Sequence, residues 1–285
     1  MHSLGNNRQK RKGQHYIPRF YLKRFSTERN GEYYIWCYNT KTGNIFEANI
    51  TNVCKENWFY GRDSFIEYGL SVLEGHHSKI YKYIQNNPIY ALAEIEKRTI
   101  MEFVYVTHAR TRKARGATLD INEEVQYDEN FRRKFQYVFP GQNIEGELER
   151  IRKGIQFANI FGIKIPSYNY DPKTEETMKK LMKYDYYILK NNTGKDFYTS
   201  DHPISQFTTS EKEGIKVAIP LASDLFLIMY KGEDWIQMYP SQKIQVNEWF
   251  ANEANEATIQ AANNFIFSKT NDFEIVKKVL SNQDE

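Results

Sequence analysis

The order of hydrophobic periods along this chain is the feature that most constrains its fold. Residues 32–50 alternate aromatic and β-branched side chains around a glycine-containing turn, which predicts a β-hairpin. Helical spacing follows over residues 65–84 and 91–115, period two returns between residues 184 and 231, and residues 247–265 form a last helix. Strands and helices are thus segregated rather than alternating. We expect an α+β fold with an N-terminal β-hairpin, a central helical region and a C-terminal antiparallel sheet with a closing helix.

The composition is that of an ordinary globular chain. Of its 285 residues, 40% are hydrophobic and 15% aromatic, which excludes a disordered or low-complexity protein. Neither a repeat nor a linker rich in Gly, Ser and Pro divides the chain. We therefore expect a basic arm at residues 1–13 and a single α+β domain at residues 14–280. Further helices are expected within residues 122–161 and from Asp171.

The apolar runs are too short for a membrane protein. None approaches the ~18 residues of a spanning helix, and the mean hydropathy is −0.71. The N-terminus is polar and basic and lacks the apolar region of a secretory signal. A chain of this size buries its core without a disulfide, so Cys37 and Cys54 are expected to be reduced. We expect a cytoplasmic protein with no membrane partner.

Basic residues gather at the N-terminus. The first 25 residues contain seven Lys or Arg and no Asp or Glu, a composition that attracts polyanions such as nucleic acid. A solvated arm without a partner is the alternative. Glycine-rich phosphate loops, zinc fingers and the H-E-x-x-H and G-x-S-x-G patterns are absent from the sequence in their required context. Any chemistry must therefore come from polar residues that the fold brings together.

Arg110 is the most constrained of the charged residues. It lies four residues after Val106 and seven after Phe103, so it shares their apolar helix face. A guanidinium turned inward needs an anionic partner, either an internal carboxylate or the phosphate or carboxylate of a substrate, and the sequence leaves both open. Arg112 and Lys113 suit the helix C-terminus by the helix dipole alone, or bind a substrate.

Residues 199–203, Thr-Ser-Asp-His-Pro, end a strand in a turn. Loop residues at a sheet end often hold catalytic groups, and Asp201 and His202 are candidates. The two side chains point apart in an extended chain and do not form a dyad by themselves. An Asx-turn at Asp201 is the structural alternative.

Two more candidates lie near the predicted helices. His15 precedes a short helix that begins after Pro18, where an anion is also favoured, although a structural histidine is equally compatible. Glu74 and His77 lie three residues apart on one side of a helix, as in di-iron bundles. A second Glu-x-x-His is absent from the sequence, so a surface glutamate beside a histidine at the core edge is the alternative.

The segment Gln14–Phe25, QHYIPRFYLKRF, resembles the opening signature of the bacterial domain-of-unknown-function family 4238. Further matches follow in the same order: Leu70–Glu74, Thr107–Arg110, Thr199–Pro203, Pro220-Leu221, and a closing helix and strand with Asn252, Ala261 and Phe265–Ser268. The resemblance spans roughly residues 14–268 and implies no established reaction. It implies that His15, Glu74, Arg110 and Asp201 occupy the family's polar positions, whereas His202 stands where members often have Asn.

These residues lead to a first hypothesis, a metal-assisted hydrolase of phosphodiesters resembling a nuclease. His15 would act as general base or as a third metal ligand, Arg110 would stabilise the phosphate, and Asp201 would act with Glu74 in holding a divalent metal ion. The expected substrate-binding residues are Gln14, Arg19, Arg112 and Lys113.

The alternative is a non-catalytic module that binds nucleic acid or a protein, in which the same polar residues form a buried structural network. The enzyme requires these side chains to converge on a pocket with room for a ligand. The module predicts a dry cluster whose members satisfy one another.

Overall fold

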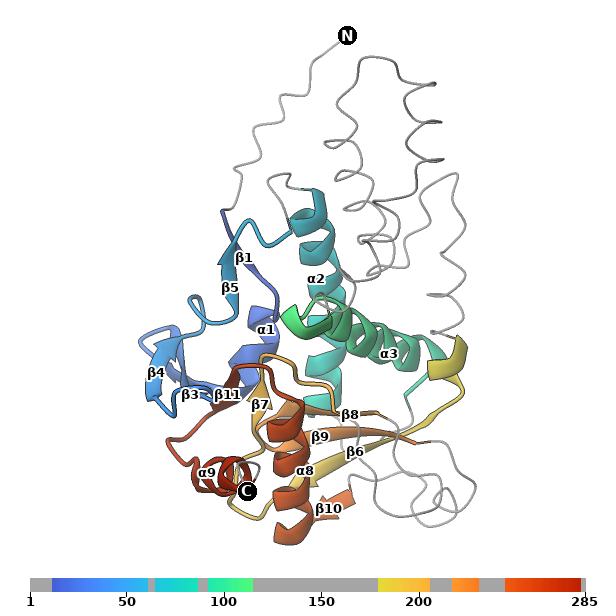
Figure 1. Cartoon of the computed structure of the whole chain (residues 1–285). Coiled ribbons are helices and arrows are strands. Elements are labelled where there is room, and N and C mark those ends of the chain that lie inside the picture. Colours follow the sequence, from blue (N-terminus) through green and yellow to red (C-terminus); the bar gives the residue numbers. More distant parts are fainter. Residues whose placement is uncertain are drawn as a thin grey trace, which may run out of the picture.

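The computed structural model describes residues 12–60, 65–86, 92–114, 179–205, 217–230 and 244–282. Two larger sheets, a small two-stranded sheet and the helices packed on them make up these residues (Figure 1). The expected α+β class is confirmed. The predicted helices within residues 122–161 and from Asp171 lie outside the described residues, as does most of the expected arm. In the described part of the chain, no helix is both long and apolar enough to cross a membrane.

The first sheet joins the two ends of the chain. The predicted hairpin is confirmed as β3 (Glu32–Asn39) and β4 (Ile45–Asn49), and Gly43 in its turn has φ +71°, a conformation that favours glycine. On its other edge, β3 pairs antiparallel with β11 (Phe265–Ser268). The remaining strands are β2 (Thr27–Arg29), which also pairs with β3, and β7 (Thr199–Ser200), which pairs with β11.

The second sheet has the order β10-β6-β9-β8. Its antiparallel part is the predicted one and consists of β6 (Asp185–Asn191), β8 (Val217–Ala222) and β9 (Leu225–Tyr230). Two details differ from the sequence prediction. The short β10 (Ile244–Val246) adds a parallel edge to β6, and β7 belongs to the first sheet because its backbone pairs with β11.

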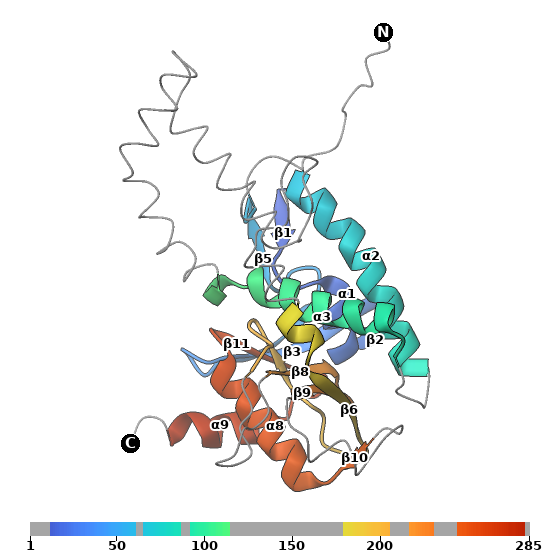
Figure 2. The same cartoon turned by 90° about the vertical axis from the view of Figure 1, so that its right-hand side faces the viewer.

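Helices pack on these sheets and cover both faces of the second one. Their bounds are α1 (Arg19–Leu22), the 3₁₀ turn η1 (Lys23–Phe25), α2 (Phe65–Asn86), α3 (Glu94–Ala109), α8 (Glu248–Ala261) and α9 (Glu274–Ser281). A small two-stranded sheet, β1 (Gly13–His15) with β5 (Lys55–Asn57), lies beside α2 (Figure 2). The helix predicted over residues 91–115 is shorter, because α3 ends at Ala109. Asn247 caps α8 by accepting a hydrogen bond from the Phe250 N–H at 2.9 Å.

Alternation along β9 explains this layering. Leu227 and Met229 join the core that α2 and α3 supply, whereas Phe226 and Ile228 pack with Ala251 and Ala254 of α8. Successive strand residues face opposite sides, so β9 is apolar on both faces, as a strand covered by helices must be.

Tyr21 of α1 ties the helical layer to both sheets. Its ring packs against Tyr81 of α2 and Phe103 of α3. Its hydroxyl donates to the Pro220 carbonyl in β8 at 2.8 Å and contacts the Thr199 hydroxyl of β7 at 2.6 Å. The buried core consequently runs without a break from the N-terminal segment to the last strand.

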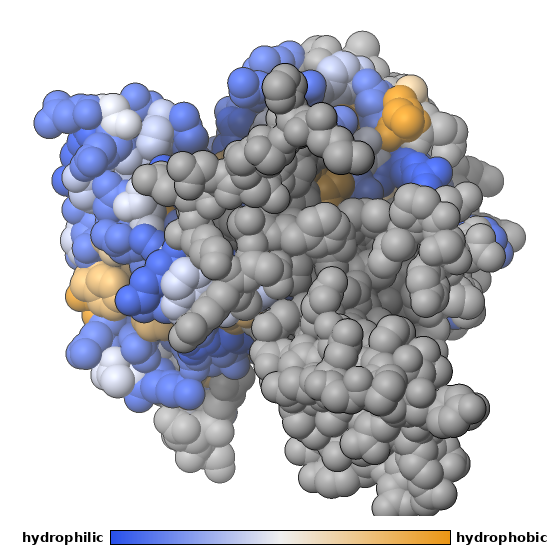
Figure 3. All heavy atoms as spheres, turned by 90° about the horizontal axis from the view of Figure 1, so that it is seen from above, coloured by the Kyte–Doolittle hydropathy of each residue, from blue (hydrophilic) through white to orange (hydrophobic). Residues whose placement is uncertain are grey.

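The surface and the cysteines follow the expected pattern. Most of the described surface visible from above is hydrophilic, with small hydrophobic patches between (Figure 3). Cys37 and Cys54 are buried free thiols, and burial raises the pKa of both.

Candidate ligand-binding cavity

Arg110, the residue that follows α3, is a fully buried cation with internal partners. Its Nε donates to the Tyr60 hydroxyl at 3.0 Å, its Nη1 to Glu74 Oε1 at 2.8 Å and its Nη2 to the His15 carbonyl at 2.6 Å. The side chain is 2% exposed. Of the two partners that the sequence left open, the structure has the internal carboxylate, that of Glu74.

The network keeps the guanidinium charged. Burial lowers the pKa of Arg110, but Tyr60 and Glu74 outweigh it and raise the pKa above its ordinary value. The three hydrogen bonds run from the end of α3 to α2, to β1 and to the chain after β5. Arg110 therefore joins four segments that are distant in sequence.

Gln14 and His15 belong to the same cluster. The Gln14 side-chain oxygen accepts a hydrogen bond from the Tyr60 N–H at 2.6 Å, and the His15 Nε2 contacts the Thr51 carbonyl at 3.2 Å. Burial first, and then the positive charge of Arg19, lower the pKa of His15 to about 4. His15 is consequently neutral at neutral pH. Its ring donates to a backbone carbonyl, a structural role.

Asp201 caps a distant turn. Its carboxylate is 1% exposed and accepts hydrogen bonds from the backbone N–H of Asn263 at 2.9 Å and of Asn264 at 3.0 Å. Burial raises the pKa of Asp201, while these N–H groups act in the opposite direction. The backbone N–H of Asp201 also donates to the Phe265 carbonyl. The carboxylate thus anchors the turn between α8 and β11.

The four expected residues are placed in two groups. His15, Glu74 and Arg110 meet in one network, whereas Asp201 is bonded to the turn after α8. The two carboxylates expected to hold a metal ion are therefore both engaged by protein donors. Within the described residues, no group of three or more His, Cys, Asp or Glu side chains is arranged to hold a metal ion.

A cavity of about 450 Å³ lies beside the C-terminal half of α3, and we call it the His202 cavity. Its walls come from α3 and the turn after it, from the segment after β7, and from the ends of β8 and α8. The lining residues are Val104, Tyr105, His108, Lys113, Leu181, His202, Ile204, Ser205, Val217 and Ala261. Mostly apolar walls with a few polar groups are typical of a small-molecule site.

His202 is the most constrained polar group of the cavity. It is 6% exposed, its Nδ1 lies 2.8 Å from the Thr111 hydroxyl, and its ring centre lies 5.1 Å from that of His108. Burial first, and then the charges of His108 and Lys113, lower the pKa of His202 to about 4. The imidazole is neutral at neutral pH and lies in a positive environment.

The predicted substrate-binding residues lie in different parts of the structure. Only Lys113 lines the cavity, and its Nζ donates to the Ala261 carbonyl at 3.0 Å, leaving two of its three N–H groups for other acceptors. Arg112 is paired with Glu56, Arg19 is exposed at the start of α1, and Gln14 is buried in the Arg110 network.

Sequence reasoning did not select His108 or Ser205. A signal for His108 was present, since it follows Val104 by four residues and so shares its helix face, and both line the cavity. Ser205 gave no such signal, because its position depends on an isolated pairing with Ala218 of β8.

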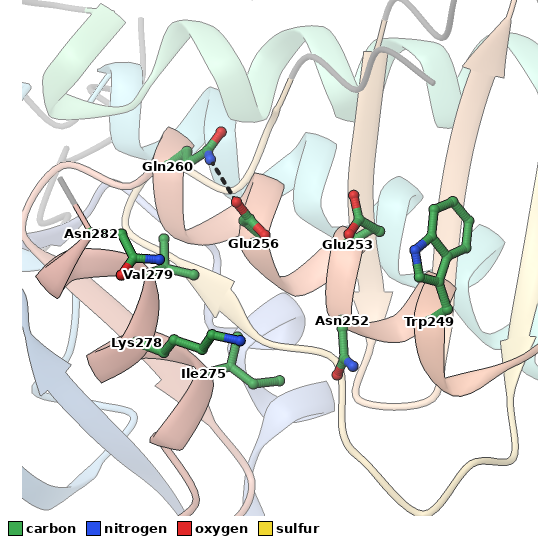
Figure 4. Close-up of a pocket in the computed structure, with 9 residues that line it drawn as sticks. All are labelled: Trp249, Asn252, Glu253, Glu256, Gln260, Ile275, Lys278, Val279 and Asn282. Atoms are coloured by element: carbon green, nitrogen blue, oxygen red, sulfur yellow. Dashed lines mark hydrogen bonds between the residues drawn. The ribbon is translucent and has the colours of Figure 1, made fainter. Parts of the chain in front are cut away.

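A second hollow, of about 410 Å³, lies between α8 and α9 (Figure 4). Glu253, Glu256 and the 62% exposed Trp249 line its α8 side, and Lys278 lines its α9 side. Gln260 donates to Glu256 within it. Unlike the His202 cavity, it holds no histidine, and we take the His202 cavity as the candidate site.

Comparison with known proteins places the chain in a family. The model of a family described as protein of unknown function (DUF4238) matches residues 13–272. The chain belongs to this family. The matched range includes both polar networks and the His202 cavity, and it confirms the resemblance noted from the opening motif. Neither the curated proteins nor the solved structures give a match.

We predict that Arg110→Lys destabilises the protein strongly, by on the order of 3 kcal/mol or more, because one ammonium cannot serve Tyr60, Glu74 and the His15 carbonyl together. Arg112→Lys is the matched control, because its exposed pair with Glu56 contributes at most about 1 kcal/mol. Urea denaturation of the two variants and wild type measures both changes. Equal loss in the two variants would contradict the structural role of Arg110.

We predict a pH-dependent stability to which His202 contributes. An unfolded histidine takes up a proton below its ordinary pKa of 6.5, but the native pKa of His202 is about 4. The free energy of unfolding therefore falls by up to about 3 kcal/mol because of His202 as the pH falls from 6.5 to about 4. His202→Asn should show a shallower decrease in the free energy of unfolding from pH 7 to 4.5, with His15 contributing equally to both proteins. Identical pH profiles would rule out this contribution.

Proposed function

We propose that this protein binds a small ligand that combines a phosphate group with an apolar, nucleotide-sized body, and that it does so in the His202 cavity. The observation that carries the proposal is the asymmetric lining: Lys113 and two imidazoles on the polar side, and aliphatic and aromatic side chains elsewhere. The volume of about 450 Å³ lies within the range of roughly 300–1,000 Å³ that is usual for ligand pockets.

The charge of the cavity favours an anion. Among the described residues that line it are one lysine and two histidines but no Asp or Glu. Burial and the charge of Lys113 lower the pKa of both His108 and His202, so at neutral pH Lys113 is the cation that makes the potential in the cavity positive. A phosphate would offset this potential and accept hydrogen bonds from the Lys113 N–H groups that do not donate to Ala261.

The apolar lining fits the body of such a ligand. Tyr105 is partly exposed and lines the cavity together with Val104 and Leu181. An aromatic ring beside aliphatic side chains suits a planar base, since bases stack on aromatic rings without need of a specific hydrogen bond.

The two polar networks support this cavity. Arg110 directly precedes Thr111, whose hydroxyl contacts the His202 ring. Asp201 stands between Ser200 and His202 in the sequence. The turn that Asp201 anchors follows Ala261, whose carbonyl holds Lys113. In this proposal the networks fix the walls, and the ligand meets residues between them.

Metal-assisted hydrolysis of a phosphodiester stays a second proposal. The observation that favours it is the neutral imidazole of His202 close to the cation of Lys113, a base beside a charge that stabilises phosphate. Glu74 and Asp201, the expected metal ligands, are held by Arg110 and by the turn after α8.

The test is calorimetric titration with adenosine monophosphate, adenosine and inorganic phosphate. We expect adenosine monophosphate to bind, and Lys113→Gln to weaken its affinity about tenfold or more, because a charge-assisted hydrogen bond is lost. Adenosine, which lacks the phosphate, should bind wild type more weakly than the nucleotide does.

Lys97→Gln is the matched control, because the Lys97 Nζ also donates to a backbone carbonyl, that of Met182, but outside the cavity. Equal loss in the two variants, or equal affinity for nucleotide and nucleoside, would contradict the proposal. Incubating labelled RNA with wild type and Mg²⁺ separates binding from hydrolysis.

A further inference from the structure

We infer that His202 contacts the ligand as a hydrogen-bond acceptor through Nε2, because Thr111 fixes the proton of the ring on Nδ1. The ligand of the cavity then presents a hydroxyl or N–H donor in addition to its anionic group. The assignment of the proton stands on the hydrogen bonds alone, whereas the ligand class rests on the proposed function.

The Thr111 hydroxyl has three hydrogen-bonding neighbours. It lies 2.9 Å from the His108 carbonyl, 2.8 Å from His202 Nδ1 and 3.3 Å from the backbone N–H of Ala114. A hydroxyl has one proton and two acceptor positions. The three contacts therefore use its full capacity only in one arrangement.

Two of the three neighbours have fixed roles. The His108 carbonyl can only accept: it accepts the Thr111 backbone N–H at 3.2 Å, and the hydroxyl at 2.9 Å is placed to donate to it as well. The Ala114 N–H can only donate. The contact with His202 is then one in which Nδ1–H donates to the remaining lone pair of Thr111. A neutral ring with its proton on Nδ1 has a lone pair on Nε2.

The position of His202 in the cavity wall leaves the Nε2 lone pair available to a ligand. The ring is buried, it lines the cavity, and the titratable side chains that act on it are those of His108 and Lys113. An acceptor that lines a cavity exchanges its water for ligand groups, so a ligand that supplies a donor there is favoured over a ligand that removes the water without replacing its hydrogen bond. The doubly ionised phosphate of a nucleotide has only acceptors and cannot fill this position.

The cavity thus has two requirements. The Lys113 ammonium favours an anionic group on the ligand, and the His202 Nε2 acceptor favours a hydroxyl or amine on the same molecule. A nucleoside monophosphate has both, since it carries sugar hydroxyls and, in adenosine monophosphate, an exocyclic amino group. A ligand with a phosphate and no donor should bind less tightly.

The first experiment measures the position of the proton without any ligand. Long-range ¹H–¹⁵N correlation spectra of histidine-labelled protein report which ring nitrogen is protonated, and His202→Asn assigns the signal. We expect the Nδ1–H form in wild type and in Thr111→Ser, and loss of this preference in Thr111→Val. An Nε2–H form in folded wild type would overturn the inference.

The second experiment compares adenosine monophosphate with an analogue that lacks both ribose hydroxyls and one that lacks the exocyclic amino group. We expect at least one analogue to bind wild type about tenfold more weakly, and the difference to shrink in His202→Phe, which has no acceptor. Equal affinities of all three in wild type would overturn the ligand half of the inference and leave the proposed function intact. If no nucleotide binds, the proposed function fails, and the ligand half of the inference fails with it.

Discussion

The buried guanidinium of Arg110 is the interaction on which the described helical layer depends. A charge without water needs a complete set of partners, and Arg110 has a carboxylate, a hydroxyl and a carbonyl from three other segments. These contacts fix the end of α3 against α2 and β1. Because His108 and Thr111 lie within two residues of Arg110 in the sequence, the same contacts also determine where the polar wall of the cavity lies.

Asp201 has the corresponding role at the opposite wall. By accepting the N–H groups of Asn263 and Asn264, it joins the end of β7 to the turn between α8 and β11. Its neighbour His202 is thereby held beside Thr111. The two buried charged residues, Arg110 and Asp201, thus support the walls, and other side chains line the cavity.

Local patterns in the sequence predicted the elements whose partners lie close in the chain. The β3–β4 hairpin, α2 and the antiparallel core of the second sheet follow from periodicity, and the cap at Asn247 follows from its residue type. The pairing of β7 with β11 and of β10 with β6 depends on contacts between distant segments, which periodicity does not encode.

The same distinction applies to the site. The helical position of Arg110 predicted that it is buried and that it has an anionic partner, but only the fold selects Glu74 over a substrate. His202 and Ser205 line the cavity because β7 and β8 bring them to α3, and a turn sequence gives no sign of that. The predicted metal set instead divides between two structural networks.

The most direct test of this account is to measure stability and ligand affinity together in Asp201→Asn. The account predicts that the free energy of unfolding falls by about 1–3 kcal/mol, because an amide replaces a buried carboxylate at the turn. It also predicts that the folded variant binds adenosine monophosphate as tightly as wild type does. A variant of unchanged stability that no longer binds the nucleotide would contradict the account, since Asp201 would then contact the ligand.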